Sequence, residues 1–285
     1  MPTPEPSPER EADALAARYD DIAEGYLRWW APVIRPQAVG ILDAIAPAVE
    51  AGATRILDIG VGSGALAVAA LERWPALRVT GIDPSTEMLA VAQREAVSAR
   101  VAERLTLTRA GADRLPFDDG AFDVAVSSFV LQLVPNRHRA LVEARRVLTP
   151  GATLAWVCWL KEQRAFRGDE IADAVLDEAG YDPPEPEGRS GDLASVPAAA
   201  LATRRAGFRG VRAWAGELVH RWEPESFLAF FTRFDEASLF DELGSDESRR
   251  VEARLLERLR TLTPDELTLR LPTVSVVGRV PTTAR

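Results

Sequence analysis

The chain of 285 residues carries a formal net charge of −9, with its basic residues scattered among acidic ones. A chain of this length can bury a sizeable core without cross-links, so we expect one large domain. The scattered charges disfavour nucleic acid as a partner, and no apolar stretch is long enough to predict a membrane span. The only cysteine, Cys158, lies in an apolar run, which excludes an internal disulfide framework, makes a thiolate metal site implausible and favours a reducing, cytoplasmic compartment.

The amino-terminal segment divides into a tail and a helix. Residues 1–10 are rich in proline and acidic side chains, which predicts a disordered tail ahead of a single domain over residues 11–285. Large apolar side chains at helical spacing predict the first helix, for which Ser7 and Pro8 offer a start signal. Their positions are Leu15, Tyr19, Ile22, Tyr26 and Trp30. A second helix is predicted from about Pro36 to Ile45.

Beyond the second helix, short apolar runs alternate with helical stretches, which predicts a parallel sheet with crossover helices. The predicted strands are Arg55 to Ile59, Leu77 to Ile82, Leu105 to Arg109, Phe122 to Ser127, Thr153 to Trp159, Val211 to Val219 and Leu271 to Val280. The predicted helices are Leu66 to Arg73, Thr86 to Ala96 and Arg137 to Leu148, the last capped by Asn136. The pattern indicates an α/β fold with a doubly wound, seven-stranded and mostly parallel sheet.

Two segments interrupt this alternation, residues 161–194 and 223–268, and both follow the ends of predicted strands. The carboxyl ends of parallel strands form the ligand-binding edge of such a sheet, so we expect helical cap insertions that cover a substrate. The first contains an acidic, turn-rich stretch over residues 183–192, for which we expect mobility. The second carries four aromatic side chains on one helical face, which is typical of core packing, with a substrate wall as the alternative. They are Phe227, Phe230, Phe231 and Phe234.

The most informative stretch runs from a buried strand through three glycines into a helix. Its sequence is Ile56-Leu57-Asp58-Ile59-Gly60-Val61-Gly62-Ser63-Gly64-Ala65. Glycine accepts a positive φ in such a turn and lets a ligand approach the backbone, and the helix amino terminus offers unpaired N–H groups to an anion. Asp83 follows nineteen positions beyond Gly64, at the end of the second predicted strand, where a carboxylate can accept both hydroxyls of a ribose.

The glycines alone leave two kinds of cofactor open. Gly60, Gly62 and Ala65 also satisfy the fingerprint Gly-x-Gly-x-x-Gly/Ala, so a nicotinamide-dependent oxidoreductase is one alternative. Asp58 favours another cofactor, because a charged residue at the end of a buried strand would repel a pyrophosphate but not a ligand with an ammonium group. The anion at the helix start would then be a single carboxylate.

Four motifs in a fixed order carry a resemblance to a known family. They are Leu57-Asp58-Ile59-Gly60-x-Gly62-x-Gly64, Leu115-Pro116-Phe117-Asp118-Asp119-Gly120-Ala121-Phe122-Asp123, Ser127-Ser128-Phe129-Val130-Leu131-Gln132-Leu133-Val134 and Arg146-Val147-Leu148-Thr149-Pro150-Gly151. Over about Tyr19 to Trp159 the chain resembles the class I S-adenosylmethionine-dependent methyltransferases, in their small-molecule branch. The resemblance implies a Rossmann-like methyltransferase fold and methyl transfer to a small organic acceptor, through oxygen, nitrogen or carbon. A non-catalytic S-adenosylmethionine-binding protein is the remaining alternative.

The resemblance also assigns residues to parts of the cofactor S-adenosylmethionine. Those for the methionine part are Gly60, Gly62 and Gly64, and the residue for the ribose is Asp83. Pro84 and Met88 would flank the adenine, whose edge would meet Gly111, Ala112 and Asp113. Ser127 and Ser128 would close the site near the sulfonium. Tyr19 and Tyr26 resemble the amino-terminal segment that folds over the cofactor, with core packing as the alternative.

The sequence offers few candidates for a catalytic base. Gln132 stands where histidine is frequent in the family, which removes one candidate base, and Gly111 stands where many relatives carry an acid that accepts from the adenine amino group, so Asp113 or backbone must substitute there. His138 lies in the polar first turn of a predicted helix, which indicates a solvated side chain. His220 follows the sixth strand on the ligand edge and is therefore the candidate catalytic residue. Methyl transfer from a sulfonium depends more on position than on base strength, so an amine or carbon acceptor needs no base.

Overall fold

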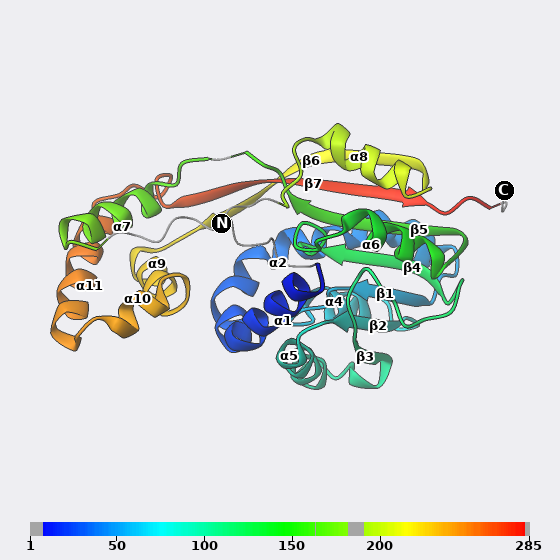
Figure 1. The fold of residues 1–285 in the computed structure, drawn as a ribbon, viewed down its shortest axis with the longest axis horizontal. Helices are drawn as coiled ribbons and strands as arrows, with labels where there is room; N and C mark the ends of the chain where they lie inside the picture. The colour runs from blue at the N-terminus through cyan, green and yellow to red at the C-terminus, as the bar shows by residue number, and fades with distance from the viewer. Residues whose placement is uncertain (1–7, 163, 182–190, 283–285) are drawn as a thin grey trace, which may run out of the picture.

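The computed structural model describes residues 8–162, 164–181 and 191–282 of the chain. In Figure 1, helices cover both faces of a sheet, and two long strands lead to a second group of helices beyond one end of it. Helix α1 (Pro8–Gly25) includes residues 8–10, which the composition assigned to a disordered tail. Ser7 and residues 183–190 of the predicted mobile stretch lie outside the described residues.

Seven strands confirm the predicted doubly wound sheet. Their order is β3-β2-β1-β4-β5-β7-β6, with β1 to β5 parallel and β7 antiparallel to both of its neighbours. The strands are β1 (Arg55–Ile59), β2 (Arg78–Asp83), β3 (Leu105–Arg109), β4 (Phe122–Ser128), β5 (Leu148–Trp159), β6 (Arg209–Arg221) and β7 (Thr268–Arg279). The order reverses between β1 and β4, and ligands of such sheets bind outside the carboxyl ends of the strands at this point.

Helices pack on both faces of the sheet. One face is covered by α6 (Arg137–Arg146) and α8 (Val196–Arg205), and the other by α3 (Leu42–Glu50) and α4 (Ala65–Arg73). Helix α5 (Thr86–Ser98) follows β2, and a 3₁₀ turn, η2 (Ala102–Arg104), leads into β3. Helix α6 begins at its predicted cap, because Asn136 Oδ1 accepts a hydrogen bond from the Arg139 N–H at 3.0 Å. None of the described helices combines the length and the apolar character needed to cross a membrane.

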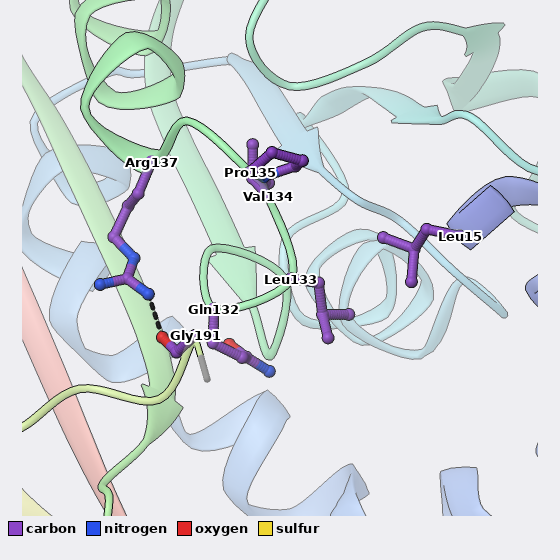
Figure 2. A pocket seen from close by; sticks show the side chains of 7 residues that line it. All are labelled: Leu15, Gln132, Leu133, Val134, Pro135, Arg137 and Gly191. Carbon is purple, nitrogen blue, oxygen red and sulfur yellow. Dashed lines mark hydrogen bonds between the residues drawn. The ribbon is translucent and has the colours of Figure 1, made fainter. Parts of the chain in front are cut away.

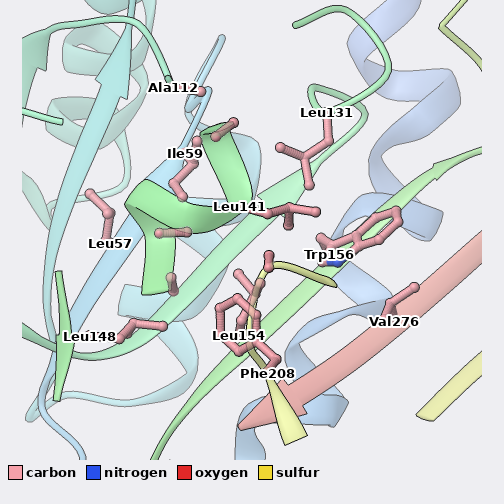
Figure 3. Close-up of a cluster of buried hydrophobic side chains, with 14 of the residues drawn as sticks. Leu57, Ile59, Ala112, Leu131, Leu141, Leu148, Leu154, Trp156, Phe208 and Val276 are labelled. Atoms are coloured by element: carbon pink, nitrogen blue, oxygen red, sulfur yellow. The ribbon is translucent and has the colours of Figure 1, made fainter. Parts of the chain in front are cut away.

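Alternate side chains of the central strands enter two different cores, which is why these strands read as continuous apolar runs. In β1, Ile56 packs with α3 and α4, whereas Leu57 packs with α6. Figure 3 shows the second of these cores, around Leu57, Leu154 and Trp156. The fully buried Trp156 donates its indole N–H to Thr203 Oγ1 at 3.2 Å, so its one polar atom is satisfied.

The predicted second helix is wrong in its bounds. The structure has two helices, α2 (Ala31–Gly40) and α3, separated at Ile41, where one helix was predicted from Pro36 to Ile45. A π-helical turn, η1 (Tyr26–Trp30), joins α1 to α2, so the helical path along the amino-terminal segment is longer than predicted.

The two predicted insertions supply the second group of helices. These are α7 (Arg167–Glu178), α9 (Pro224–Phe230), the π-helical turn η3 (Phe231–Asp235), α10 (Ala237–Glu242) and α11 (Ser245–Leu259), which we call the outer helices. They enclose a third apolar core. Its buried members include Trp222, just after β6, and three residues of the aromatic stripe, Phe227, Phe230 and Phe231, whereas Phe234 is only partly buried. Trp30 of η1 stacks on Phe230 with ring centroids 5.8 Å apart, so the amino-terminal helices connect the outer helices to the rest of the fold.

Candidate functional site

The glycine turn between β1 and α4 stands where the strand order reverses. Gly60, Gly62 and Gly64 have positive φ angles of 73°, 50° and 85°. A Cβ on Gly60 would lie 2.3 Å from Val130 Cγ2, and one on Gly64 would lie 3.1 Å from Ala92 Cα. A Cβ on Gly62 would meet no atom within 4 Å. The fold itself therefore requires glycine at positions 60 and 64, whereas the open side of Gly62 is where a ligand can reach the backbone.

Asp58, near the end of β1, is a buried carboxylate without a partner. Only 1% of its surface is exposed, and neither oxygen has a hydrogen-bond partner among the described residues. Burial, followed by the charge of Asp83, raises the pKa of Asp58 to about 7. The Ala67 N–H at the start of α4 opposes this rise in pKa without reaching hydrogen-bond geometry. Because an unpaired buried carboxylate destabilises a fold, this group points to a ligand that carries a positive charge or N–H donors.

Asp83, the last residue of β2, meets the same turn from the neighbouring strand. Its Oδ2 accepts from the Gly62 N–H at 3.0 Å, and its Oδ1 accepts from the Ser85 N–H at 3.0 Å. Burial raises the pKa of Asp83 to about 6, although both N–H groups oppose the rise. The structure thus brings the two predicted carboxylates, Asp58 and Asp83, to one glycine turn.

Helix α1 is fastened to the start of α5 by Asp20. The Asp20 Oδ1 accepts from Ser85 Oγ at 2.6 Å and from the Glu87 N–H at 3.1 Å, and these bonds hold the pKa of Asp20 below its usual range. Ser85 Oγ also caps α5 by accepting from the Met88 N–H at 3.0 Å. The connection ties α1 to the strand end that carries Asp83.

Tyr19 and Tyr26 lie in the amino-terminal helical segment that packs against α5. Their rings meet edge to face, with centroids 6.1 Å apart, and both pack on a small apolar cluster that includes Met88. Burial, with smaller contributions from Tyr19 and Asp83, raises the pKa of Tyr26, so its phenol stays neutral. Both rings therefore pack between the amino-terminal segment and α5, and their contact with a cofactor stays a prediction.

Ser127 and Ser128 end β4 beside β1. The buried Ser127 donates its hydroxyl to the Ile59 carbonyl at 2.9 Å, which joins the ends of the two strands. Its proton is therefore already engaged, and toward a ligand Ser127 can only accept. Ser128 is partly exposed at the same edge.

The chain turns sharply after β4 at Phe129. Its φ of 55° is uncommon for a residue other than glycine, and its ring stacks on Trp159 with centroids 4.0 Å apart. The next residue, Val130, packs against Gly60. The loop after β4 is thereby fixed to the glycine turn, a relation that sequence reasoning missed because it joins two distant segments.

The residues predicted for the adenine lie after β2 and β3. The Pro84 carbonyl accepts from Arg109 Nε at 2.9 Å, and the Asp113 carbonyl accepts from Arg139 Nε at 3.0 Å. A Cβ on Gly111 would lie 3.2 Å from Asp113 Oδ1. Ala112 is buried in the apolar core that packs against α6. The first bond ties the end of β3 to the residue after β2, and the second ties loop 111–113 to α6.

His220 lies apart from these residues. It stands on β6 with its ring edge to face with Trp222, at 4.3 Å between centroids, and burial lowers its pKa. The buried Trp222 Nε1 has no hydrogen-bond partner among the described residues. In the described part of the chain no hydrogen bond or ring contact joins His220 to the glycine turn, so a role for it in the site stays a prediction.

A pocket of about 450 Å³ opens between α1 and the loop after β4 (Figure 2). It is lined by Leu15, Gln132, Leu133, Val134, Pro135, Arg137 and Gly191. Gln132 is 8% exposed, and its Oε1 has no hydrogen-bond partner in the described chain. Sequence reasoning considered Gln132 only as a missing histidine and did not predict the pocket. The residues that the structure describes contain no group of three His, Cys, Asp or Glu side chains that could hold a metal ion.

Residues 57–156 match a family model described as a methyltransferase domain. The demethylmenaquinone methyltransferase of Thermus thermophilus is 40% identical over 145 residues, which are 49% of this chain and 60% of that protein. The malonyl-[acyl-carrier protein] O-methyltransferase of Geobacter sulfurreducens is 39% identical over 102 residues, which are 36% of this chain and 37% of that protein. The chain spans about half the length of the curated relatives that it matches.

A solved structure shares the fold over most of this chain. The YcgJ protein of Bacillus subtilis superposes with a TM-score of 0.55 at 19% identity, covering 86% of this chain and 98% of that protein. The superposition supports the Rossmann-like fold. The matched family segment begins in β1 and ends in β5, so it contains the glycine turn and both carboxylates but none of the outer helices.

Proposed function

Since this chain belongs by its methyltransferase domain to the class I S-adenosylmethionine-dependent methyltransferases, we propose that it transfers the methyl group of S-adenosylmethionine to a small organic molecule. The observation that carries this proposal is the buried, unpartnered carboxylate of Asp58, followed directly by a glycine turn in which the side of Gly62 is open. A pyrophosphate would be repelled at that position, whereas an amino acid joined to a nucleoside brings an ammonium group.

The residues present fit this cofactor. Asp58 would pair with its ammonium group, and the N–H groups at the amino end of α4 would receive its carboxylate. Asp83 already accepts two N–H bonds, but each carboxylate oxygen keeps a lone pair for a ribose hydroxyl. We assign the ribose to Asp83 on this basis.

We extend the assignment to the other predicted residues around the turn. Tyr19 and Tyr26 would cover the cofactor, since α1 is fastened to the start of α5. The adenine would lie against Pro84, Met88 and residues 111–113, and Ser127 and Ser128 would border the sulfonium. The contact of Met88 with the tyrosine pair and the position of Ser127 beside Ile59 support this arrangement.

When bound, S-adenosylmethionine supplies an electrophilic methyl group on a sulfonium. The residues of the chain would mainly hold the attacking atom of the acceptor in line with that group, at about 3 Å and away from water. We propose that the predicted insertion over residues 161–194, whose Gly191 lines the pocket beside the loop after β4, helps to cover the acceptor. If the acceptor is a hydroxyl, His220 is the candidate base predicted from the sequence, and burial, which lowers its pKa, favours the neutral ring that a base needs. His220 is not among the residues that line the pocket beside the loop after β4, so it would have to act on an acceptor that extends beyond this pocket.

Titration calorimetry with S-adenosylmethionine and S-adenosylhomocysteine tests the cofactor assignment. We expect micromolar binding by the wild type and at least about tenfold weaker binding by Asp83→Ala, because a hydrogen-bonding carboxylate is lost. Asp119→Ala is the matched control, since this exposed aspartate pairs with Arg146 away from the turn. Unchanged affinity of Asp83→Ala would contradict the proposal, and NADH should produce no fluorescence change with any variant.

Transfer of a labelled methyl group tests the activity. The two curated relatives are named for different acceptors, demethylmenaquinone and malonyl-[acyl-carrier protein], and both are suitable first acceptors to assay. Labelled product from either acceptor would exclude a protein that only binds the cofactor. Cofactor binding without product from these two or from a wider extract would favour that alternative.

A further inference from the structure

We propose that the pocket between α1 and the loop after β4 receives the methyl acceptor, and that this acceptor is a neutral molecule with an apolar body and one O–H or N–H group, which Gln132 positions. The inference rests on the proposed function, because it concerns the second substrate of the same reaction. The pocket has the volume of a small-molecule site, about 450 Å³.

Both walls of the pocket belong to elements that contact the proposed cofactor site. On one side, the loop after β4 is held against the glycine turn by Val130, two residues before Gln132. On the other side, Leu15 lies on α1, which Asp20 fastens to α5. A ligand in this pocket would therefore contact two elements that also border the proposed cofactor site.

The side-chain oxygen of Gln132 is a polar atom at the wall of this pocket that has no partner among the described residues. Its side chain is 8% exposed, it lies beside Gly191 and Leu133 in Figure 2, and its Oε1 accepts no hydrogen bond from the described residues. Buried amide oxygens are nearly always paired in proteins, because an unpaired one destabilises the fold. An amide kept in this state at the wall of a pocket is suited to a ligand that donates a hydrogen bond.

The other lining residues define the remaining chemistry of the ligand. The side chains of Leu15, Leu133, Val134 and Pro135 are apolar. Arg137 is the charged side chain among the described lining residues. Its guanidinium joins two segments of the lining, because Nε donates to the Leu131 carbonyl at 2.8 Å and Nη2 donates to the Gly191 carbonyl. The described residues of the lining thus present an amide and an engaged guanidinium but no carboxylate, which favours a neutral acceptor over a cationic one.

Two probes that differ in a single donor test this inference. In the presence of saturating S-adenosylhomocysteine, 2-naphthol and 2-methoxynaphthalene are titrated by their own fluorescence. We expect the wild type to bind 2-naphthol about tenfold more tightly, and we expect Gln132→Leu to bind both probes equally. Gln37→Leu is the matched control, because its amide lies elsewhere and donates to Thr273 Oγ1 at 2.9 Å, and it should retain the tenfold difference.

Thermal unfolding of the same variants separates a ligand-binding glutamine from a structural one. Removing an unpaired buried amide should raise the unfolding temperature of Gln132→Leu by a few degrees, whereas Gln37→Leu should lower it because a satisfied bond is lost. A lower unfolding temperature for Gln132→Leu, or a tenfold preference that persists in it, would overturn the role of Gln132. Binding of S-adenosylhomocysteine without binding of either probe would overturn this inference and leave the proposed function intact. Failure to bind S-adenosylhomocysteine would overturn both.

Discussion

Gly60 and Gly62 stand two positions apart in one turn, yet alanine should fail at them for different reasons. Gly60→Ala would place a Cβ 2.3 Å from Val130 Cγ2 and 2.6 Å from Val130 Cγ1. Gly62→Ala would place a Cβ in open space, on the side where we propose that the cofactor approaches. We therefore expect Gly60→Ala to destabilise the fold, and Gly62→Ala to fold but to lose affinity for S-adenosylmethionine.

The two costs can be compared in magnitude. A positive φ costs alanine roughly 1–2 kcal/mol at either position. At Gly60 the clash adds about 1–3 kcal/mol, because overpacking in a filled core is not relieved by a stiff, β-branched neighbour such as Val130. We expect a loss of about 2–5 kcal/mol in the free energy of unfolding for Gly60→Ala, against roughly 1–2 kcal/mol for Gly62→Ala.

Denaturant unfolding measures the first quantity, and calorimetry with S-adenosylhomocysteine measures cofactor affinity. Adding Val130→Ala to Gly60→Ala should recover part of the lost stability, because it removes both Cγ atoms. Equal losses of stability in the two glycine variants, or wild-type affinity in Gly62→Ala, would refute the reasoning.

Two further predictions concern charges around the same turn. The pKa values of Asp58, about 7, and Asp83, about 6, are raised above the ordinary carboxyl value, so the folded state binds protons more tightly than the unfolded state and the free energy of unfolding falls as pH rises from about 4 to 7. Asp58→Asn should accordingly stabilise the ligand-free protein by up to about 4 kcal/mol at pH 8. We also expect S-adenosylmethionine to release protons when it binds near pH 6.5, and Asp58→Asn should reduce this release. Calorimetry in two buffers of different ionisation enthalpy measures the number of protons released. No proton release in the wild type would show that Asp58 does not meet the ammonium group. Asp20→Ala removes two hydrogen bonds at the start of α5 and should weaken the docking of α1 by about 1 kcal/mol, seen as faster proteolysis within α1. Glu24→Gln, which alters only an exposed pair with Arg94, is its control, and equal protection of both variants would contradict the assigned role of Asp20.

The strands and the turn around Asp58 and Asp83 could be predicted from sequence because their determinants are local. In β1, Ile56 and Leu57 face opposite cores, so a continuous apolar run predicts a buried parallel strand. The glycine turn follows directly, and Asp83 ends the next strand at a spacing typical of nucleoside sites. The cap at Asn136 likewise depends only on its own helix.

Features that depend on distant segments could not be predicted. Proline is favoured in the first turn of any helix, so Pro32 and Pro36 are equally good start signals, and only packing decides that α2 begins at Ala31. The residues that line the pocket together with Gln132 lie on α1, in the loop of Gln132 and before α8. No local pattern reveals that the amide oxygen of Gln132 has no hydrogen-bond partner among the described residues.

The unpaired carboxylate of Asp58 has a consequence for the lifetime of the protein as well as for its chemistry. A chain that keeps such a charge in its core is less stable alone than with its ligand, and at a free ligand concentration 100 times the dissociation constant binding adds about 2.7 kcal/mol to the free energy of unfolding. Turnover by proteases that attack unfolded chains would then fall when the methyl donor is abundant and rise when it is scarce, so the amount of this protein would follow its supply.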